Sequence, residues 1–396
     1  MNRALAASLL FAAALFQVAE PITVWETGGL SDDTIESIHE AADLNGASLT
    51  IVHTGTMRLM GVTRDGEDVQ RPDPGFGYPM AVAAVSSGSD GVLSDEVMAV
   101  LKSGSVVMSE RSAALRGAAP GDVVEIESWS GEVLPLTIGS LAPDSSIFWS
   151  EIIFSTGVAR ALGFERPSGA ILTGAHDIGV TALTLRSLIP ADRPVRTYFP
   201  GMERDRRDSP LPTVLVKERF GEFSFRPVGT ADGIEIEEAW VEANIVTVDL
   251  PILGKFRCHR AVVPYLRSAV AQIDAERVGW LIDVEDFQAA GGCFNARLMR
   301  GSDSGLALSR HAWGIAIDIN PSTNGYGKTV LLPDRIGDVL RSWGFAWGAG
   351  WTVPDGMHFE WARIPGDIGP HECSAYQLLR GDGLWLVTPR SVACPI

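Results

Sequence analysis

The first half of the chain alternates apolar and polar positions in short blocks, interrupted by helical patterns. A helix is predicted over 31–46, where Ser31 is a suitable N-cap and Gly46 a suitable stop. The same reading of hydrophobic periodicity predicts further elements. These are a strand at 22–26, a pair of strands within 48–62, strands at 122–128 and 132–142, and a helix at 150–164. Residues 20–228 are therefore expected to form a mixed α/β domain.

A Gly-rich turn and a change in the character of the sequence near residue 228 predict a domain boundary, with a second domain over 229–396. A helix is predicted over 333–345, with Asp334 as a cap and Gly344 as a stop. The remaining elements expected here are a strand-like segment at 244–256, a helix at 261–273, and strands at 314–320 and 357–361. The fold class expected for the chain is α+β.

Composition and charge narrow the classes of function. The chain has 396 residues, of which 46% are hydrophobic and 20% charged, as in ordinary globular proteins. The formal net charge is −17, which repels nucleic acid and anionic membrane surfaces. We therefore expect no nucleic-acid partner.

The N-terminus has the pattern of a secretory signal peptide over residues 1–19. Arg3 precedes an uncharged apolar stretch that ends at Ala19, the expected cleavage point. The alternative is an uncleaved anchor, although the apolar run is short for a membrane span. We expect a secreted protein of the cell envelope that has no stable membrane insertion after cleavage.

If the protein is exported, its four cysteines are expected to form disulfides, because the compartment outside the cytoplasm is oxidising. They are Cys258, Cys293, Cys373 and Cys394. Four cysteines allow three connectivities, and we expect Cys258–Cys293 and Cys373–Cys394. No pair is spaced as in a structural zinc ribbon.

Two clusters in the second half bring histidines and acids onto strand-like polar faces. In the segment 309–320, alternation places Asp318 on the polar face, and a bend at Gly314 could turn His311 toward it. The second cluster carries Asp355 and His358. A His–Asp pair of this kind is often only a structural hydrogen bond, but two such clusters in a histidine-poor chain favour a shared site.

Two imidazoles and a carboxylate form a three-ligand zinc site whose fourth position stays open to water. Zn²⁺ in such a site lowers the pKa of bound water to roughly 7 and polarises a peptide carbonyl. A further carboxylate must take the proton from water. Asp355 is the candidate base. Glu360 is its competitor, but it is better placed as a partner of a ligand.

The two clusters also carry a resemblance to a known family. The signatures SxHxxGxAxD (309–318) and DxMHF (355–359) occur in order. Together they resemble the VanY-type zinc D-alanyl-D-alanine carboxypeptidases and the related L-alanyl-D-glutamate endopeptidases. The resemblance covers about residues 229–365. It implies a zinc-peptidase fold with a small, mostly antiparallel central sheet flanked by helices.

Carried over by position, the resemblance implies the following site. The zinc ligands are His311, Asp318 and His358; the base is Asp355; Ser309 contacts the substrate. The family also uses an upstream arginine on the carbonyl oxygen, usually in a GYRS-like stretch that is absent here. Arg297 or Arg300 would take this role, and Arg297 is preferred.

The function expected from these residues is hydrolysis of the peptide stem of peptidoglycan, of the D-Ala–D-Ala carboxypeptidase type. The alternatives are an L-Ala–D-Glu endopeptidase, or a non-catalytic cell-wall- or protein-binding module that keeps the fold. A serine D,D-peptidase is disfavoured because no lysine has a serine three positions before it. Residues 106–144 faintly resemble the extracytoplasmic domains of MacB-type permeases, which favours an accessory role for the N-terminal half.

Overall fold

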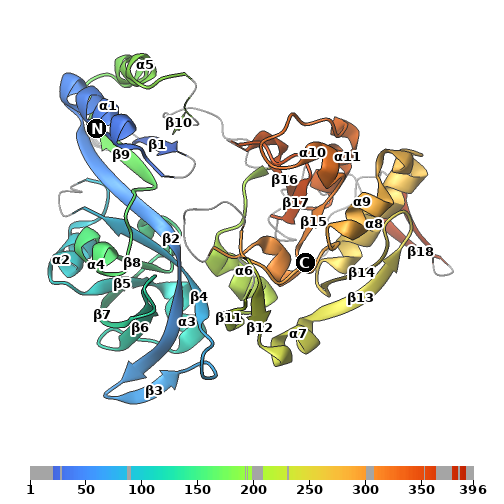
Figure 1. Ribbon diagram of the computed structural model, residues 1–396, viewed down its shortest axis with the longest axis horizontal. Coiled ribbons are helices and arrows are strands. Elements are labelled where there is room, and N and C mark those ends of the chain that lie inside the picture. The colour runs from blue at the N-terminus through green and yellow to red at the C-terminus, as the bar shows by residue number, and fades with distance from the viewer. Residues whose placement is uncertain are drawn as a thin grey trace, which may run out of the picture.

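The computed structural model shows two lobes, the N-terminal one in blue to green and the C-terminal one in yellow to red (Figure 1). The expected signal peptide, Arg300, Cys373 and Cys394 lie outside the described residues. The structure describes residues 21–26, 29–86, 91–191, 193, 195–198, 208–229, 232–299, 307–351, 353–362, 377–381 and 384–388. The chain is thus a mixed α/β protein with separately organised parts, as expected.

Six strands of the N-terminal lobe close into a barrel, because the last strand in the order pairs back with the first. In order around the barrel they are β2 (Ser48–Arg64), β4 (Tyr78–Val85), β8 (Ile152–Ser155), β5 (Val106–Ser109), β7 (Val133–Ala142) and β6 (Val123–Glu127). Its interior is filled by fully buried apolar side chains, among them Met57, Leu59 and Phe154. A short strand, β3 (Glu67–Gln70), pairs with the end of β2.

The long strand β2 also leaves the barrel and joins a second group of strands. There it pairs with β9 (Gly169–Thr173), which is followed by β1 (Ile22–Glu26) and β10 (Val195–Tyr198). Helices α1 (Asp32–Asn45) and α5 (Ile178–Leu188) pack on each other beside this extension. Helices α2 (Asp95–Lys102) and α3 (Glu110–Arg116) lie at the barrel.

The structure confirms some local predictions for this lobe and corrects two. Ser31 caps α1 through its hydroxyl, and Gly46 ends that helix with a φ of 63°. The predicted strand pair at 48–62 is one continuous strand, which pairs with β9 at its start and with the barrel strands β4 and β6 farther along. The helix predicted over 150–164 is wrong in its first half. That half is the strand β8, buried between β4 and β5, and only α4 (Thr156–Ala161) is helical.

The C-terminal lobe holds a three-stranded antiparallel sheet of order β15-β17-β16. Its strands are β15 (Ala316–Asp318), β16 (Phe345–Trp347) and β17 (His358–Trp361). The helix predicted over 333–345 is α11 (Asp334–Ser342), in which Asp334 is the first helical residue and Pro333 the cap. The chain then turns at Gly344, whose φ is 97°.

The C-terminal lobe has further helices and strands, most of which contribute side chains to one hydrophobic core. They are α6 (Thr213–Phe220), β11 (Phe225–Pro227), β12 (Ile234–Ile236), α7 (Glu238–Asn244), β13 (Ile245–Leu250), β14 (Gly254–His259), α8 (Val263–Ala275), α9 (Val284–Ala289), α10 (Pro321–Asn324), β18 (Gln377–Gly381) and β19 (Leu384–Thr388). The core includes Val216 and Phe220 of α6 as well as residues of every strand of the small sheet. The domain boundary near residue 228 stays a prediction.

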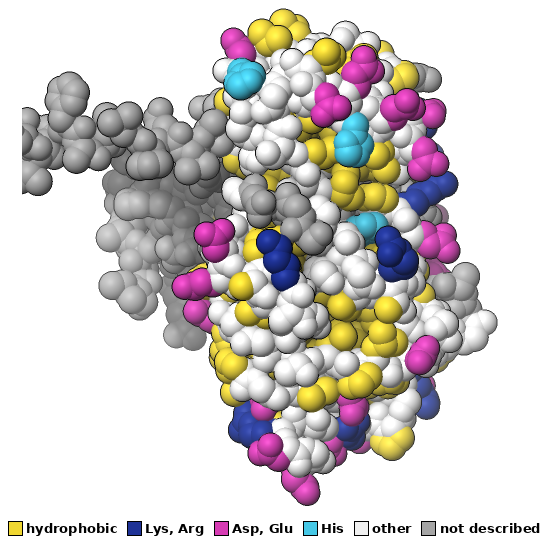
Figure 2. Space-filling model, turned by 90° about the vertical axis from the view of Figure 1, so that its left-hand side faces the viewer, with side chains coloured by type: hydrophobic (Ala, Val, Ile, Leu, Met, Phe, Trp, Pro, Cys, Tyr) yellow, Lys and Arg dark blue, Asp and Glu magenta, His cyan; other side chains and the backbone are white. Residues whose placement is uncertain are grey.

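The outer face of the N-terminal lobe is of mixed character. Figure 2 shows apolar side chains across its middle, with acidic side chains around the periphery of this face. Among the residues that the structure describes, no helix combines the length and apolar character that a membrane crossing requires. The candidate chemistry lies in the other lobe.

Candidate metal centre

The register of the small sheet places two of the expected ligands opposite each other. β15 pairs with β17 so that Asp318 faces His358 and Ala316 faces Glu360. The residues between them are apolar and buried: Ile317 packs in the core, and so does Phe359. Alternation along each strand therefore sends the polar side chains to the opposite face from the core.

A single turn of 3-10 helix, η4 (Arg310–Trp313), carries the third expected ligand. Ser309 caps this turn, and its hydroxyl accepts the His311 N–H at 3.3 Å. The turn ends at Gly314, whose φ of 65° is a left-handed conformation that favours glycine. A Cβ at this position would also lie 2.9 Å from the backbone nitrogen of His259. The bend predicted at Gly314 is therefore present, and it brings His311 next to Asp318.

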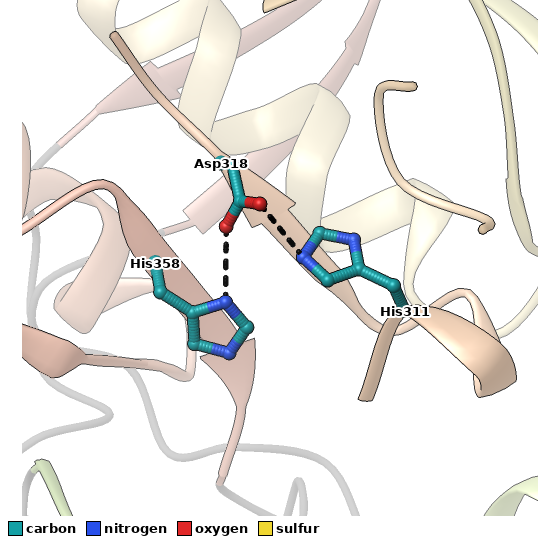
Figure 3. A group of neighbouring side chains, drawn as sticks. All are labelled: His311, Asp318 and His358. Atoms are coloured by element: carbon teal, nitrogen blue, oxygen red, sulfur yellow. Dashed lines mark hydrogen bonds and ion pairs between the residues drawn. The ribbon is translucent and has the colours of Figure 1, made fainter. Parts of the chain in front are cut away.

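The three side chains converge on one point (Figure 3). His311 Nε2 lies 3.2 Å from one carboxylate oxygen of Asp318, and His358 Nδ1 lies 3.0 Å from the other. One ligand atom from each residue lies within 4.8 Å of the other two, and all three residues are buried. His311 Nε2 is buried and, among the described residues, has no hydrogen-bond partner besides this contact with Asp318. A buried imidazole nitrogen aimed at a carboxylate and a second imidazole fits a divalent cation such as Zn²⁺.

In each imidazole, the ring nitrogen that points away from Asp318 has a polar partner of its own. This partner determines which ring nitrogen can face a metal. His311 Nδ1 lies 3.0 Å from the carbonyl oxygen of Cys293 and can donate to it, which leaves Nε2 for the metal. His358 Nε2 lies 3.1 Å from a carboxylate oxygen of Glu360, which leaves Nδ1. Glu360 thus occupies the position of an orienting partner, as the sequence favoured.

Arg310 is a residue of this site that the sequence reasoning did not single out. Its Nε lies 3.5 Å from Glu360 Oε1, and its other nitrogens reach Leu211 and Thr213 in the segment that joins the lobes. Its position next to His311 in the sequence was the only available signal. Arg310 therefore connects the partner of a candidate ligand to the interlobe segment.

Three further residues expected at the site line one cavity together with Asp318 and His358. These are Asp355, Arg297 and Ser309. Asp355 lies in a turn, where its carbonyl oxygen accepts the His358 N–H at 3.1 Å. Its Oδ1 is buried without a hydrogen-bond partner. The structure therefore places the expected base, arginine and serine around the same space as the candidate ligands.

Burial and neighbouring charges shift the pKa values of the site in opposite directions. Burial raises the pKa of Asp318, but His311 and His358 lower it by more, so that the net pKa is well below its usual value. Asp355 differs: burial raises its pKa to about 6, and Asp318 raises it as well, against the lowering effect of His358, His311 and Arg297. Asp318 is therefore ionised, as a carboxylate that binds a cation must be, and Asp355 has the pKa of a group that can exchange a proton near neutral pH.

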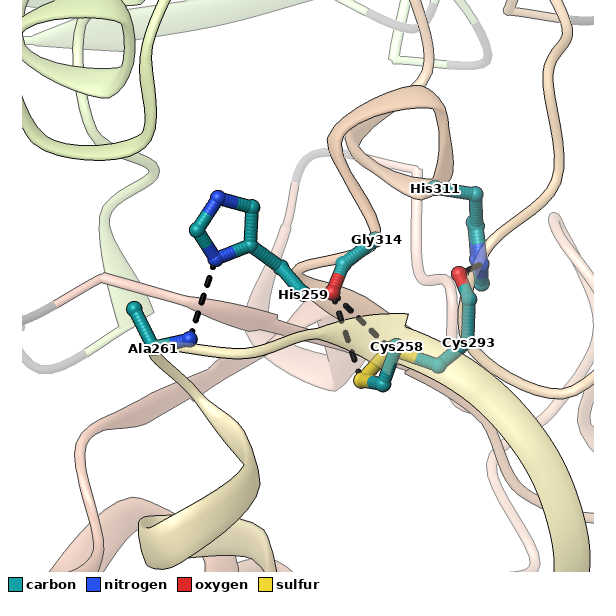
Figure 4. The surroundings of a disulfide bond; sticks show 6 residues. All are labelled: Cys258, His259, Ala261, Cys293, His311 and Gly314. Atoms are coloured by element: carbon teal, nitrogen blue, oxygen red, sulfur yellow. Dashed lines mark hydrogen bonds between the residues drawn. A yellow bond between two sulfur atoms is a disulfide. The ribbon is translucent and has the colours of Figure 1, made fainter. Parts of the chain in front are cut away.

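A disulfide supports the backbone around His311 (Figure 4). Cys258 and Cys293 are bonded, which confirms this predicted pair. The carbonyl oxygen of Gly314 lies 3.3 Å and 3.0 Å from their sulfur atoms; these are close contacts, since a disulfide sulfur has no hydrogen to donate. The carbonyl group of Cys293 itself faces His311 Nδ1. The disulfide thus links β14 to the segment that orients a candidate ligand.

Comparisons with known proteins find a family match and likenesses to solved structures. No curated protein matches the chain. Among solved structures, one match is the extracellular domain of the noncanonic ABC-type transporter YknZ from Gram-positive bacteria. It is 12% identical and covers 42% of this chain and 88% of that chain, with a TM-score of 0.29. Residues 302–361 match the model of a family described as D-alanyl-D-alanine carboxypeptidase. This segment contains the three candidate ligands and Asp355, so the resemblance of the C-terminal region to this family, expected from its motifs, is confirmed.

Proposed function

We propose that the C-terminal lobe is a zinc-dependent peptidase that hydrolyses the peptide stem of peptidoglycan outside the cytoplasm. The observation that carries the proposal is the convergence of His311, Asp318 and His358, with their ligand atoms within 4.8 Å of one another. The family match over 302–361 supports a peptidase, and the same family is zinc-dependent. A bound Zn²⁺ would lower the pKa of a water ligand and polarise the scissile carbonyl.

The surrounding side chains supply the other parts of the reaction. Asp355 takes a proton from the attacking water at its unpartnered Oδ1 and passes it to the leaving amine. The Arg297 guanidinium, which lines the same cavity, stabilises the negative charge that develops on the carbonyl oxygen. Ser309 borders the cavity as well and is proposed to contact the substrate, in addition to capping the turn that carries His311.

The test is hydrolysis of a defined pentapeptide stem by the full-length protein, with products identified by mass spectrometry. Loss of the terminal D-Ala assigns the carboxypeptidase reaction, and cleavage between L-Ala and D-Glu assigns the endopeptidase reaction. We expect a chelator to abolish turnover and added Zn²⁺ to restore it. Failure of the zinc-loaded protein to cleave any stem peptide would favour the binding-module alternative.

A matched pair of variants tests the role of the base. Asp355→Asn should lower kcat by about 10²- to 10⁴-fold, the usual contribution of a general base, while bound zinc stays stoichiometric. Asp334→Asn is the control, because Asp334 is an exposed acid at the start of α11. Equal activities of the two variants would remove Asp355 from the mechanism without affecting the metal assignment.

A further inference from the structure

The cavity beside the candidate metal centre is much larger than a stem peptide bond requires, and both lobes line it. Its volume is about 1490 Å³, above the roughly 300–1,000 Å³ of most small-molecule sites. The C-terminal lobe contributes Asp355 and His358. The N-terminal lobe contributes a group that we call the aromatic wall, formed by Trp25, Thr54, Thr56, Trp129, Phe164 and Arg166. A ligand that fills this cavity must therefore extend from the metal centre onto the N-terminal lobe.

Trp129 is the most exposed aromatic side chain of this wall. It keeps 40% of its surface accessible, although its ring packs against Phe164 with the centroids 5.0 Å apart. The backbone N–H of Trp129 donates to the carbonyl oxygen of Leu162 at 3.1 Å. Gly163, the residue after Leu162, has a φ of 97°. A Cβ on Gly163 would lie 3.2 Å from the Trp129 Cβ. The backbone therefore holds this indole in place while one side of it faces the cavity.

Trp25 is positioned by a second glycine on the neighbouring strand. Trp25 of β1 pairs with Gly169 of β9 in the sheet. A Cβ on Gly169 would lie 2.5 Å from the Trp25 ring, so the indole occupies the space that a side chain would need. Gly169 pairs on its other side with Val52 of β2. The sheet thus presents a flat aromatic surface to the same cavity as Trp129.

Polar side chains accompany these two indoles. Thr54 and Thr56 are two positions apart on β2 and therefore point to the same face of the strand. Glu165 and Arg166 are exposed and line the same cavity. Flat apolar rings combined with hydroxyl and charged groups suit a ligand with apolar C–H faces and hydroxyl edges, which is the chemistry of a pyranose ring.

We infer that the aromatic wall binds the glycan strand of peptidoglycan, so that the N-terminal lobe positions the sugar chain while its attached stem peptide enters the metal centre. This inference rests on the proposed function, since the stem is covalently joined to an amino-sugar strand. The continuity of one cavity from Trp25 and Trp129 to Asp355 and His358 carries it. The N-terminal lobe then supplies substrate selection, and the C-terminal lobe supplies the reaction.

The first experiment measures binding without catalysis. Peptide-free glycan strands are titrated into the full-length protein and into two variants, Trp129→Ala and Trp280→Ala. Trp280 is the matched control because it is 81% exposed and does not line the cavity. We expect wild type and Trp280→Ala to bind alike, and Trp129→Ala to bind at least about tenfold more weakly, as for an aromatic anchor that the ligand covers. Equal binding by all three, or no binding by wild type, overturns the inference.

The second experiment separates this inference from the proposed function. Turnover is compared on a free pentapeptide and on the same peptide attached to a tetrasaccharide. Trp129→Ala should lower kcat/KM about tenfold on the glycan-linked substrate only. Trp129→Phe keeps a ring against Phe164, so its kcat/KM on the glycan-linked substrate should lie between those of wild type and Trp129→Ala. Thermal unfolding checks that both variants fold. An equal loss on both substrates contradicts a glycan site. If no peptide is cleaved but glycan still binds, the proposed function fails and the glycan site stands.

Discussion

Replacement of Lys217 by methionine should destabilise the protein strongly, because Lys217 lies at the centre of a buried charge cluster between the lobes. Its ammonium group contacts Glu151 at 2.8 Å and Glu222 at 2.9 Å, and it also donates to the carbonyl oxygen of Pro79. Arg116 is the second cation, in contact with both acids. The side chains of Lys217, Glu151 and Arg116 have no exposed surface. Two cations and two anions thus balance in a largely buried site.

The size of the effect follows from this balance. Lys217→Met keeps the volume of the side chain but leaves two buried carboxylates with one cation. Removal of one partner from a buried pair costs about 3–5 kcal/mol in the free energy of unfolding. Burial raises the pKa of Glu222, yet Arg116 and Lys217 lower it by more, so its net pKa is below the usual value. Glu222 would therefore lose one of the two cations that favour its ionised form.

Urea unfolding followed by tryptophan fluorescence measures the change. The same substitution at exposed Lys102 is the control and should change stability by less than about 0.5 kcal/mol. The double variant Lys217→Met/Glu151→Gln restores the charge balance and should be more stable than Lys217→Met alone. The reasoning is refuted if Lys217→Met costs no more than Lys102→Met, or if the double variant costs the sum of the two single changes.

Further predictions concern the C-terminal lobe. Burial lowers the pKa of His259 to about 4 in the folded protein, against about 6.5 in the unfolded chain. As the pH falls from about 6.5 to about 4, the unfolded chain therefore binds a proton that the folded protein does not. The free energy of unfolding should fall by about 3 kcal/mol over this range. Urea midpoints across pH should show this slope, and His259→Gln should flatten it. Glu360→Gln should weaken zinc binding about 10–100-fold, because Glu360 orients His358; competition with a chromophoric chelator measures this, and unchanged affinity would contradict the role. The disulfide Cys258–Cys293 closes a loop with a sequence separation of 35 residues. Its reduction should lower the free energy of unfolding by about 4 kcal/mol, because the unfolded chain gains conformational freedom. Equal urea midpoints with and without reductant would refute this prediction.

The electrostatics of His358 link metal removal to protons. Burial lowers the pKa of its imidazole, but Asp318 and Glu360 raise it by more, to about 10 in the metal-free protein. A metal at Nδ1 must displace the proton shared with Asp318. Metal affinity should therefore rise with pH, and the metal-free protein should keep the two strands together through the His358–Asp318 ion pair.

Local patterns in the sequence determined much of the candidate site and several elements of the fold. Alternation over 314–320 and 357–361 gave the polar faces of Asp318 and His358, and the cap and stop of α1 were readable from Ser31 and Gly46. These features follow from hydrogen bonding and side-chain periodicity within a few residues. The family resemblance carried by the two motifs then implied the ligand set, whose three side chains the structure brings together.

Only the tertiary structure decided the features that depend on contacts between distant segments. Burial between two strands makes 152–155 a strand rather than the start of a helix. The link from Arg310 to Glu360 and the charge cluster around Lys217 join residues that no short pattern relates. The same holds for the cavity that places Trp129 and His358 along one surface. Periodicity reports which face of an element is buried, whereas its partner is set by packing across the whole chain.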